Sequence, residues 1–450
     1  MAFELTKEYL EKLETSIEAL DAKALKTELD SLFPPDIASI LDELSGSQAH
    51  YLMTLVDTET GAEILSNIES DERKRFIREQ FSSQEIANYV NLFDSDDAVD
   101  LLNEQPIKVR EEVIALLEDR EQARFILDLL HYPEDLAGGL MQKELVKVFA
   151  GKTVNECVEE IRNQAENVDK VFAVYVVDEN QTLLGIVSLK QIVLARKNTK
   201  VENIYDDDIV KVTTDVSGEQ VAELMQRYDL EAIPVVNVQG RLLGRITIDD
   251  VVDFITEKAD EDIQAMAGIT GEVEEDDSLL KQIKARLPWL VVGVMGSLIA
   301  GLVIRFFEAE LAKMTALAAF IPLMGSTGGN VGIQTSSLIV QSLADKSGLT
   351  TSLGERLSKI IIIALLNGIV IGCLAGLFVY IMGEPQLFWV VSLSLLSVVI
   401  LASFMGTLTP ILLDRIGINP AIASGPFITT ANDIIGIITY FFIAHLLIHI

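Results

Sequence analysis

The stretch FITTANDIIGIITYFFIAHLLI, residues 427–448, places Asp433 inside an apolar run that is long enough to cross a bilayer. A carboxylate near the middle of a membrane costs about 2.5–3.5 kcal/mol on insertion scales, so it persists only where it faces water, a partner group or an ion. Apolar runs occupy residues 287–307, 312–343, 360–382, 387–413 and 421–450. At about 1.5 Å per helical residue each can span roughly 30 Å of hydrocarbon, so the C-terminal part is predicted to be an α-helical membrane domain of five spans.

The charged residues are segregated from these apolar runs. The chain has 450 residues, 49% of them hydrophobic, and a formal net charge of −33. Residues 287–450 carry 6 Lys or Arg and 7 Asp or Glu, so nearly all the negative charge lies on residues 1–286. This acidic, soluble half argues against nucleic-acid binding and favours cations as partners. Cys157 and Cys373 lie in different halves, so no disulfide framework is expected and a reducing cytoplasm suits the soluble half.

Basic residues near the ends of the spans predict the orientation in the membrane. They precede the first span, separate the second from the third and separate the fourth from the fifth: Lys281, Lys284, Arg286, Lys346, Arg356, Lys359 and Arg415. The third-to-fourth connection, GEPQ, has no basic residue, and the C-terminal end has only His449. Lys313, between the first two spans, is the one basic residue that does not fit this pattern. The positive-inside rule therefore places the N-terminus in the cytoplasm and the C-terminus outside. The N-terminal MAFELTKEYLEKLETS has no apolar signal core, which agrees with a cytoplasmic start.

The second span contains residues that contact with lipid does not explain. It reads IPLMGSTGGNVGIQTSS over residues 321–337 and places Pro322, four glycines, Asn330 and Gln334 at membrane depth. This composition predicts a broken span whose freed carbonyls and amides line a cavity or pore. The alternative is a face of small residues on which membrane helices pack closely.

The fifth span reads SGPFITTANDIIG over residues 424–436. Pro426 is expected to break the helix there and to free carbonyls beside Thr429, with Asn432 and Asp433 following within a turn.

The polar groups of both spans are oxygen donors or amides, and none is a thiolate or an imidazole. Such ligands suit a hard cation, Mg²⁺ or Ca²⁺, rather than zinc or copper. In a symmetric dimer two copies of Asp433 would flank one axis, beside which a partly hydrated ion could pass. The alternative is an ion pair with a buried base, and Arg305 is the one Lys or Arg inside the spans apart from Lys313, which lies at the outer edge of the second run.

The first 131 residues show only helical periodicity. The related segments PPDIASILDEL, DTETGAEILSNI, SSQEIANYVNLF and DSDDAVDLLNEQ each contribute one small residue to a loose repeat: Ala38, Ala62, Ala87 and Ala98. The repeat predicts an all-α superhelix of paired helices. Its acidic cluster, Asp94, Asp96, Asp97 and Asp100, is expected to be a solvated helix start.

A clearer repeat follows in the soluble half. VYVVDENQTLLGIVSLKQIV, starting at Val174, aligns with IPVVNVQGRLLGRITIDDVV, starting at Ile233, at a constant offset of 59 residues. Each copy is predicted to form a strand, a turn, a strand and a helix.

These two copies resemble a tandem pair of cystathionine-β-synthase-type (CBS) modules. The resemblance implies a pseudo-twofold α/β pair that often binds ATP or another adenine nucleotide through a Ser or Thr and an Asp three residues later. Thr247 and Asp250 match this pattern, whereas Ser188 is followed by Gln191. A nucleotide site and a purely structural module therefore both stay open.

The segment TEKADEDIQAMAGITGEVEEDDSLLKQIKARLPWL, residues 256–290, is predicted to form a helix that connects the second module to the membrane. Glu257, Asp260, Glu261 and Asp262 crowd one to two turns of it. Two unit charges about 4 Å apart repel by about 4 kcal/mol at an effective dielectric of about 20. A bridging divalent cation would reverse the sign, so this surface is expected to switch with ion concentration; the alternative is a permanently solvated acidic face.

The whole arrangement, with PLMGSTGGNVGIQ and GPFITTANDIIG in the spans, resembles the MgtE family of magnesium channels. The expected parts are an N-domain, two CBS modules, a connecting helix and the membrane domain, over residues 1–131, 132–200, 201–258, 259–286 and 287–450. The resemblance implies a homodimer with a central pore in a bacterial inner membrane. Mg²⁺ bound between the soluble domains would close the pore, and its loss would open it.

The resemblance also implies site residues. The pore ion would lie at Asp433, with Thr429 and Asn330 in the wall. The implied cytosolic sensor comprises Asp96, Asp100, Gly138 or Gly139, Glu219, Asp229, Asp250, Asp253, Glu261 and Asp262. Four positions depart from the family pattern, where acids or a pore-entrance amide are expected: Ser217, Lys258, Asn419 and Gly425. These departures bear on the number and affinity of the cytosolic sites.

The expected function is passive Mg²⁺ conduction gated by cytosolic Mg²⁺. A coupled carrier in which Asp433 titrates is the alternative within transport, and a nucleotide-sensing membrane scaffold is a third reading. An enzyme is not expected, because an intramembrane aspartyl protease needs two carboxylates and the spans offer one per chain. Oxygen ligands do not rank Mg²⁺ against Mn²⁺, Co²⁺ or Ca²⁺.

Overall fold

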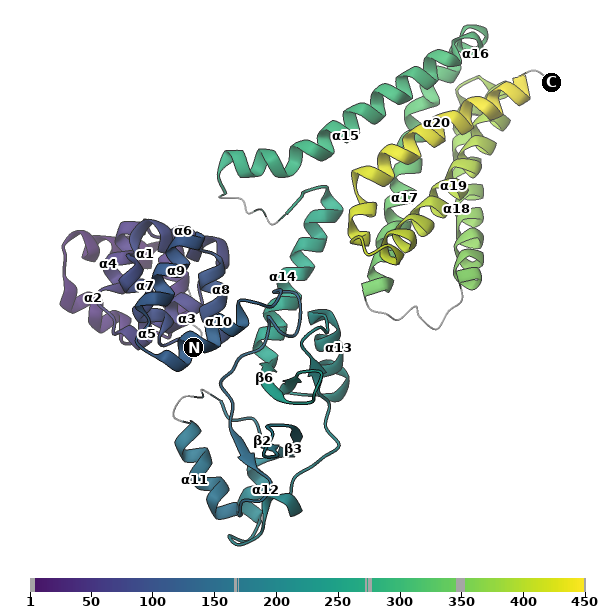
Figure 1. Cartoon of the computed structure of the whole chain (residues 1–450). Coiled ribbons are helices and arrows are strands. Elements are labelled where there is room, and N and C mark those ends of the chain that lie inside the picture. The colour runs from purple at the N-terminus through teal and green to yellow at the C-terminus, as the bar shows by residue number, and fades with distance from the viewer. Residues whose placement is uncertain are drawn as a thin grey trace. The chain divides into compact units, whose positions relative to one another are not determined.

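The computed structural model describes residues 5–165, 168, 170–271, 273, 277–344 and 353–448 (Figure 1). Lys346 and His449, two of the charges near the span ends, lie outside the described residues. The chain divides into two compact units, Met1–Ile255 and Thr256–Ile450.

Helices alone build the N-terminal part of the first unit. They are α1 (Lys7–Glu18), α2 (Ala22–Leu29), α3 (Pro34–Asp42), α4 (Gly46–Met53), α5 (Thr58–Ser66), α6 (Ser70–Gln80), α7 (Ser83–Val90), α8 (Ser95–Asn103), α9 (Ile107–Leu116) and α10 (Arg120–Leu129). Alternate helices pack in two rows: α3, α5, α7 and α9 form one, and α4, α6, α8 and α10 form the other. The small residues of the repeat are all buried: Ala38, Ala62, Ala87 and Ala98. The predicted all-α superhelix is confirmed.

Two three-stranded sheets complete the first unit. The first module comprises β1 (Lys147–Phe149), α11 (Val154–Gln164), β2 (Val174–Val177), β3 (Leu183–Val187), α12 (Leu189–Leu194) and the 3₁₀ turn η2 (Val201–Asn203). The second comprises β4 (Val212–Thr213), α13 (Gly218–Tyr228), β5 (Ala232–Val236), β6 (Leu242–Thr247) and α14 (Ile248–Ala267). In both sheets the first two strands pair parallel and the last two antiparallel. The predicted α/β repeat is confirmed.

The two modules pair through their turns. Leu183 N donates to Gly240 O at 2.9 Å, and Leu242 N donates to Gln181 O at 3.0 Å. Because equivalent strands exchange equivalent hydrogen bonds, the pair has the pseudo-twofold arrangement expected of CBS modules.

Among its described residues, the second unit contains five helices that are long and apolar enough to cross a membrane. They are α15 (Leu279–Phe306), α17 (Ile321–Ala344), α18 (Leu353–Ile381), α19 (Phe388–Arg415) and α20 (Pro426–Ile448), joined in part by α16 (Glu308–Lys313), η3 (Thr315–Phe320), η4 (Pro385–Leu387) and η5 (Pro420–Ser424). Figure 1 shows α17, α18, α19 and α20 gathered in one bundle, with α15 beside α20. The predicted five-span membrane domain is confirmed.

Glycines bring α18 and α19 close together. A Cβ on Gly372 would lie 2.8 Å from Ser392 O, and one on Gly376 would lie 2.9 Å from the Phe388 ring. The Ser392 hydroxyl then donates to Gly372 O at 2.8 Å. This is the close backbone approach that small residues permit between membrane helices.

The prediction of a broken second span is wrong. α17 runs without interruption from Ile321 to Ala344, because its glycines are packed by neighbouring helices and Pro322 lies in the first turn, where a missing N–H breaks no helical bond. The break predicted in the fifth run is present: η5 ends at Ser424 and α20 begins at Pro426.

Candidate functional site

Asp433 lies partly buried on α20, one turn after Thr429. One side of its carboxylate rests on α17, since a Cβ placed on Gly325 would lie 3.1 Å from Asp433 Oδ1 and one on Gly329 would lie 3.8 Å from it. Within the part of the chain that the structure describes, this carboxylate has no ion-pair or hydrogen-bond partner. An ion pair with Arg305 therefore finds no support among these residues.

A polar stripe runs along α17 on the surface of the single chain. Ser326, Asn330, Gln334 and Gln341 are exposed and follow at intervals of four, four and seven residues, which places them on one face of the helix. Lipid cannot satisfy hydroxyl and amide groups at membrane depth. This face therefore has to meet water or another protein surface. Asn330 directly follows Gly329, so the stripe runs beside the place where Asp433 rests.

An acidic cluster forms where the start of α8 meets the start of α14. Asp96 is only 7% exposed, so the expectation of a solvated helix start is wrong for this residue. Burial, and then the charges of Asp250 and Asp97, raise the pKa of Asp96 well above its usual value. Burial also raises the pKa of Asp250 to about 6, although hydrogen bonds from Thr247 oppose the shift. The fold thus brings together carboxylates that lie far apart in the sequence.

In the part of the chain that the structure describes, few hydrogen-bond donors or positive charges compensate the negative charges of this cluster. Asp96 Oδ1 has no hydrogen-bond partner among the described residues, and Asp96 Oδ2 lies 3.4 Å from Gln142 Nε2. Burial raises the pKa of Asp97 as well, with Arg73 opposing and Asp253 adding to the shift. A divalent cation would offset this concentration of buried negative charge. Among the described residues, however, no three Asp, Glu, His or Cys side chains already converge as in a formed metal centre.

The other predicted sensor residues occupy different places. Asp100 lies on the next turn of α8 with an exposed side chain, yet desolvation of its carboxyl by the surrounding protein, and then the charge of Asp97, raise its pKa to about 7. Gly138 packs under the Tyr132 ring, where a Cβ would lie 2.5 Å from a ring carbon. Glu219 lies in the first turn of α13, and Asp229 ends that helix with a left-handed φ of 55°. Glu219 and Asp229 are not among the charges that most strongly affect the three buried acids of the cluster.

Direct partners relieve part of the predicted repulsion on the connecting helix. Glu261 forms an ion pair with Lys258 at 2.5 Å, and Asp262 Oδ1 accepts a hydrogen bond from Asn419 Nδ2 at 2.8 Å. Lys258 and Asn419 are two of the four departures from the family pattern. The side chains at these two positions therefore bind Glu261 and Asp262 directly.

Gly425, a third departure, lies where the end of α14 packs against the start of α20. A Cβ on Gly425 would lie 2.5 Å from Met266 O, so no side chain fits there.

The pair expected to bind an adenine nucleotide, Thr247 and Asp250, is engaged in capping a helix. Thr247 N and Oγ1 donate to Asp250 Oδ2 at 3.1 and 2.5 Å. In the first module Ser188 and Gln191 form the same kind of capping box at the start of α12. Both copies therefore have a structural use for this pattern, and Asp250 belongs to the acidic cluster at the same time.

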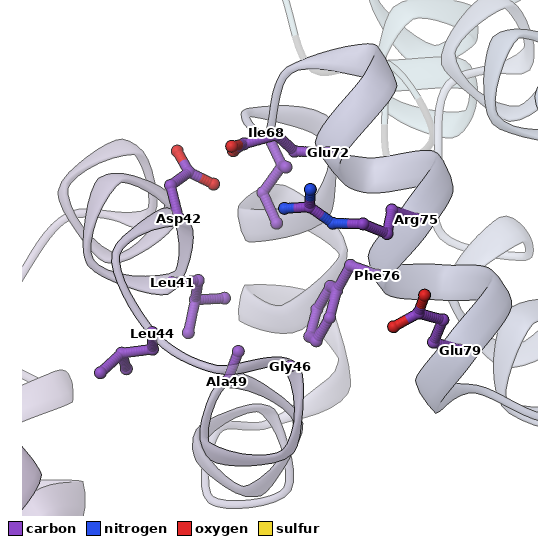
Figure 2. A pocket seen from close by; sticks show the side chains of 10 residues that line it. All are labelled: Leu41, Asp42, Leu44, Gly46, Ala49, Ile68, Glu72, Arg75, Phe76 and Glu79. Atoms are coloured by element: carbon purple, nitrogen blue, oxygen red, sulfur yellow. The ribbon is translucent and has the colours of Figure 1, made fainter. Parts of the chain in front are cut away.

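The N-domain has a small concavity between α3, α4 and α6 (Figure 2). Figure 2 shows the Arg75 side chain reaching from α6 toward Asp42, with the Phe76 ring next to it. Its volume of about 70 Å³ is far below the roughly 300 Å³ at which small-molecule sites begin, so it is not a nucleotide site.

Three features acquired their significance only in the structure: Gln142, Gly325 and the buried Asn432. Gln142 stands in a segment without any recognisable motif, so no sequence signal pointed to it. Gly325 and Asn432 belong to the two span motifs, but their partners depend on how the helices pack.

The fold and these sites define a multi-pass membrane protein whose soluble half carries an acidic, CBS-containing module. Family models match three parts: "Divalent cation transporter" (MgtE) over residues 321–443, "MgtE intracellular N domain" over 32–135, and "CBS domain" over 137–198 and 201–257. The chain belongs to the MgtE family of divalent cation transporters. The finer domain boundaries given above stay predictions.

Relatives and solved structures agree with this membership. The magnesium transporter MgtE of Thermus thermophilus is 34% identical over 450 residues, 97% of this chain and 99% of the relative. That of Bacillus subtilis is 29% identical, over 94% and 93% of the two chains. The crystal structure of the cytosolic domain of the Mg²⁺ channel MgtE in complex with ATP matches with 32% identity and a TM-score of 0.52, covering 54% of this chain and 99% of that one.

Proposed function

We propose that this protein is a homodimeric Mg²⁺ channel of a bacterial inner membrane, with its N-terminus in the cytoplasm and its C-terminus outside. The observation that carries the proposal is the Asp433 carboxylate, which has no partner among the described residues and lies beside a polar stripe that runs along α17. An ion path is the arrangement in which both features are satisfied at membrane depth, since water and a passing cation supply the missing partners.

The second subunit completes the path. One chain leaves the polar face of α17 exposed, and a twofold partner would cover it while adding a second Asp433 to the same axis. Two carboxylates match the charge of one divalent cation. A partly hydrated Mg²⁺ would pass between them, with its waters bonded to Thr429, Asn330 and neighbouring backbone oxygens.

Cytosolic Mg²⁺ gates this path in the proposal. Without a cation, the charges of the buried Asp96 and of the half-buried Asp97 and Asp250 repel, so the contact between α8 and α14 is weakened. A bound divalent cation strengthens that contact and favours the closed state. The solved cytosolic domain of the related channel contains ATP, and we infer that the CBS pair of this chain also takes an adenine nucleotide near Thr247.

Mg²⁺ flux into liposomes tests the pore assignment. Asp433→Asn should abolish uptake while leaving the folded protein intact. Asp414→Asn, the same change at an exposed acid near the end of α19, is the matched control and should conduct normally. Undiminished flux in Asp433→Asn would refute the assignment.

Single-channel recording separates the channel from a coupled carrier in which Asp433 titrates. A channel gives unitary currents that persist without a proton or Na⁺ gradient, whereas a carrier gives none.

A further inference from the structure

Two consecutive residues of α20 fit into two rows of glycines on α17. Asp433 lies over Gly325 and Gly329, as described above. Asn432 lies over Gly328 and Gly332: a Cβ on Gly328 would lie 3.7 Å from Asn432 Cβ, and one on Gly332 would overlap Asn432 Nδ2. The glycine spacing of α17 therefore matches these two α20 side chains.

Asn432 is an unusual residue to find in this contact. It is 2% exposed, and neither Nδ2 nor Oδ1 has a hydrogen-bond partner among the described residues. A buried amide without partners costs free energy, so its position needs an explanation other than stability. Its close fit against Gly332 supplies one, because inserting this side chain fixes how far α20 is rotated and shifted along α17.

We propose that Gly325 and Gly329 are specificity-determining positioning residues, which set where the Asp433 carboxylate lies relative to a passing ion. The insertion of Asn432 at Gly332 fixes the register that brings Asp433 onto them. This inference rests on the proposed function and adds that ion discrimination depends on the two glycines of α17 against which the Asp433 carboxylate packs. Neither glycine supplies a ligand atom; each acts through the carboxylate.

The geometry predicts what a methyl group added to Gly325 or Gly329 does to the position of Asp433. A Cβ 3.1 Å from Asp433 Oδ1 is closer than ordinary van der Waals contact, so Gly325→Ala displaces the carboxylate by a few tenths of an ångström. On Gly329 the added Cβ meets Thr429 Cγ2 at 3.1 Å, so Gly329→Ala displaces the residue one turn before Asp433. Both helices retain their secondary structure, because Ala favours a helix more than Gly does.

The displacement changes ion discrimination more than it changes folding. Mg²⁺ binds oxygen at about 2.0–2.1 Å and gives up water reluctantly, whereas Ca²⁺ accepts about 2.3–2.6 Å and a looser shell. A shift of about 0.3 Å in a charge about 4 Å from a divalent ion changes its binding by about threefold at an effective dielectric of about 20. Because the two ions hold their water differently, the change is unequal for Mg²⁺ and Ca²⁺.

The test measures Ca²⁺ and Mg²⁺ flux separately, with the full-length protein in liposomes. Gly325→Ala and Gly329→Ala should each change the Ca²⁺-to-Mg²⁺ flux ratio, by up to about threefold, because the change in binding of about threefold estimated from the displacement is unequal for the two ions. Gly293→Ala and Gly301→Ala on α15 are matched controls, because a Cβ at either position meets nothing within 4 Å, and both should keep the wild-type ratio. A wild-type ratio in both Gly325→Ala and Gly329→Ala overturns the proposal, as does a fall in both fluxes at an unchanged ratio.

A second pair of variants addresses the register. Gly332→Ala should change the flux ratio or lower the thermal midpoint, since its Cβ would overlap Asn432 Nδ2 and would lie 2.6 Å from Ile428 Cγ2. Gly332→Ala combined with Asn432→Ala should recover part of the midpoint, because the overlapping amide is gone while the contact with Ile428 remains. No recovery in the double variant overturns the role of Asn432. Asp433→Asn, measured in the same assay, distinguishes failure of this inference from failure of the channel proposal. If Mg²⁺ flux persists in Asp433→Asn, the channel proposal itself is refuted. If Asp433→Asn loses its flux but the glycine variants keep the wild-type flux ratio, only the present inference is refuted.

Discussion

Replacing Asp250 with Asn removes one charge from the acidic cluster and keeps the shape of the side chain. The hydrogen bonds from Thr247 N and Oγ1 are retained, since an amide oxygen accepts them as a carboxylate does. Burial raises the pKa of Asp250 from 3.8 to about 6. Since a pKa difference of one between the folded and unfolded states corresponds to about 1.4 kcal/mol, the ionised carboxylate destabilises the metal-free fold by about 3 kcal/mol above pH 7.

The sign of the pH dependence follows from the direction of this shift. A carboxyl group with a higher pKa in the folded state favours folding fully below its unfolded pKa of 3.8, and this contribution is lost as the pH rises through about 6. Without divalent cations, Asp250→Asn should therefore match the wild type near pH 4 and exceed it by about 3 kcal/mol in unfolding free energy near pH 7.5. Millimolar Mg²⁺ should reduce the difference, because the cation stabilises the wild-type cluster more.

Urea unfolding of residues 1–267, followed by circular dichroism in EDTA between pH 4 and 8, measures this difference. A related cytosolic domain was crystallised in isolation, so the fragment is a reasonable object for the assay. Asp249→Asn is the matched control: that side chain is exposed and paired with Lys170 at 3.2 Å, so its removal should not stabilise the fold. A constant difference between Asp250→Asn and the wild type across this pH range would refute the reasoning.

Two further predictions concern packing. Arg73 Nη2 lies 2.6 Å from Glu104 Oε1, and both side chains are about 10% exposed or less. Arg73→Leu leaves a buried carboxylate without its basic partner, with the Ser70 hydroxyl still donating to Oε1 at 2.9 Å, and should lower the unfolding free energy by about 3 kcal/mol in the same urea assay. Adding Glu104→Leu should recover most of the loss, and a single-variant cost below about 1 kcal/mol would contradict the assignment of a buried pair. Gly372→Val should lower the thermal midpoint of the full-length protein in detergent, because even its Cβ would lie 2.8 Å from Ser392 O. Gly301→Val, in open space on α15, should not, and equal midpoints in the two variants would show that the α18–α19 contact tolerates a side chain.

Periodicity and composition predicted the parts of this protein well. Five apolar runs become five long helices, and the 59-residue repeat becomes two sheets with the same strand order and the same pairing directions. Both signals are local, because a span is defined by its length of apolar sequence and a module by its alternation of strand, turn and helix. The break at Pro426 was predictable for the same reason, since the proline ring prevents the chain from continuing a preceding helix.

The glycines of α17 show where local reasoning fails. Their number suggested a broken span, yet the helix is continuous, because helix propensity alone does not decide the outcome once α19 and α20 pack against the small residues. The acidic cluster fails in a similar way. Asp96 looked like a solvated helix start, and it is buried because the fold brings α14 against α8.

By itself, the sequence determined that a lone carboxylate lies in the last span, that the soluble half is acidic and that two copies of one module separate them. Only the tertiary structure decided what these groups face. Asp433 packs against Gly325 and Gly329, Asn432 is buried with no hydrogen-bond partner among the described residues, and Asp96 lies beside Asp250. The physical reason is that burial and electrostatic neighbours are properties of packed surfaces. Residues far apart in the chain form those surfaces, and their meeting depends on the sum of many contacts that no single motif encodes.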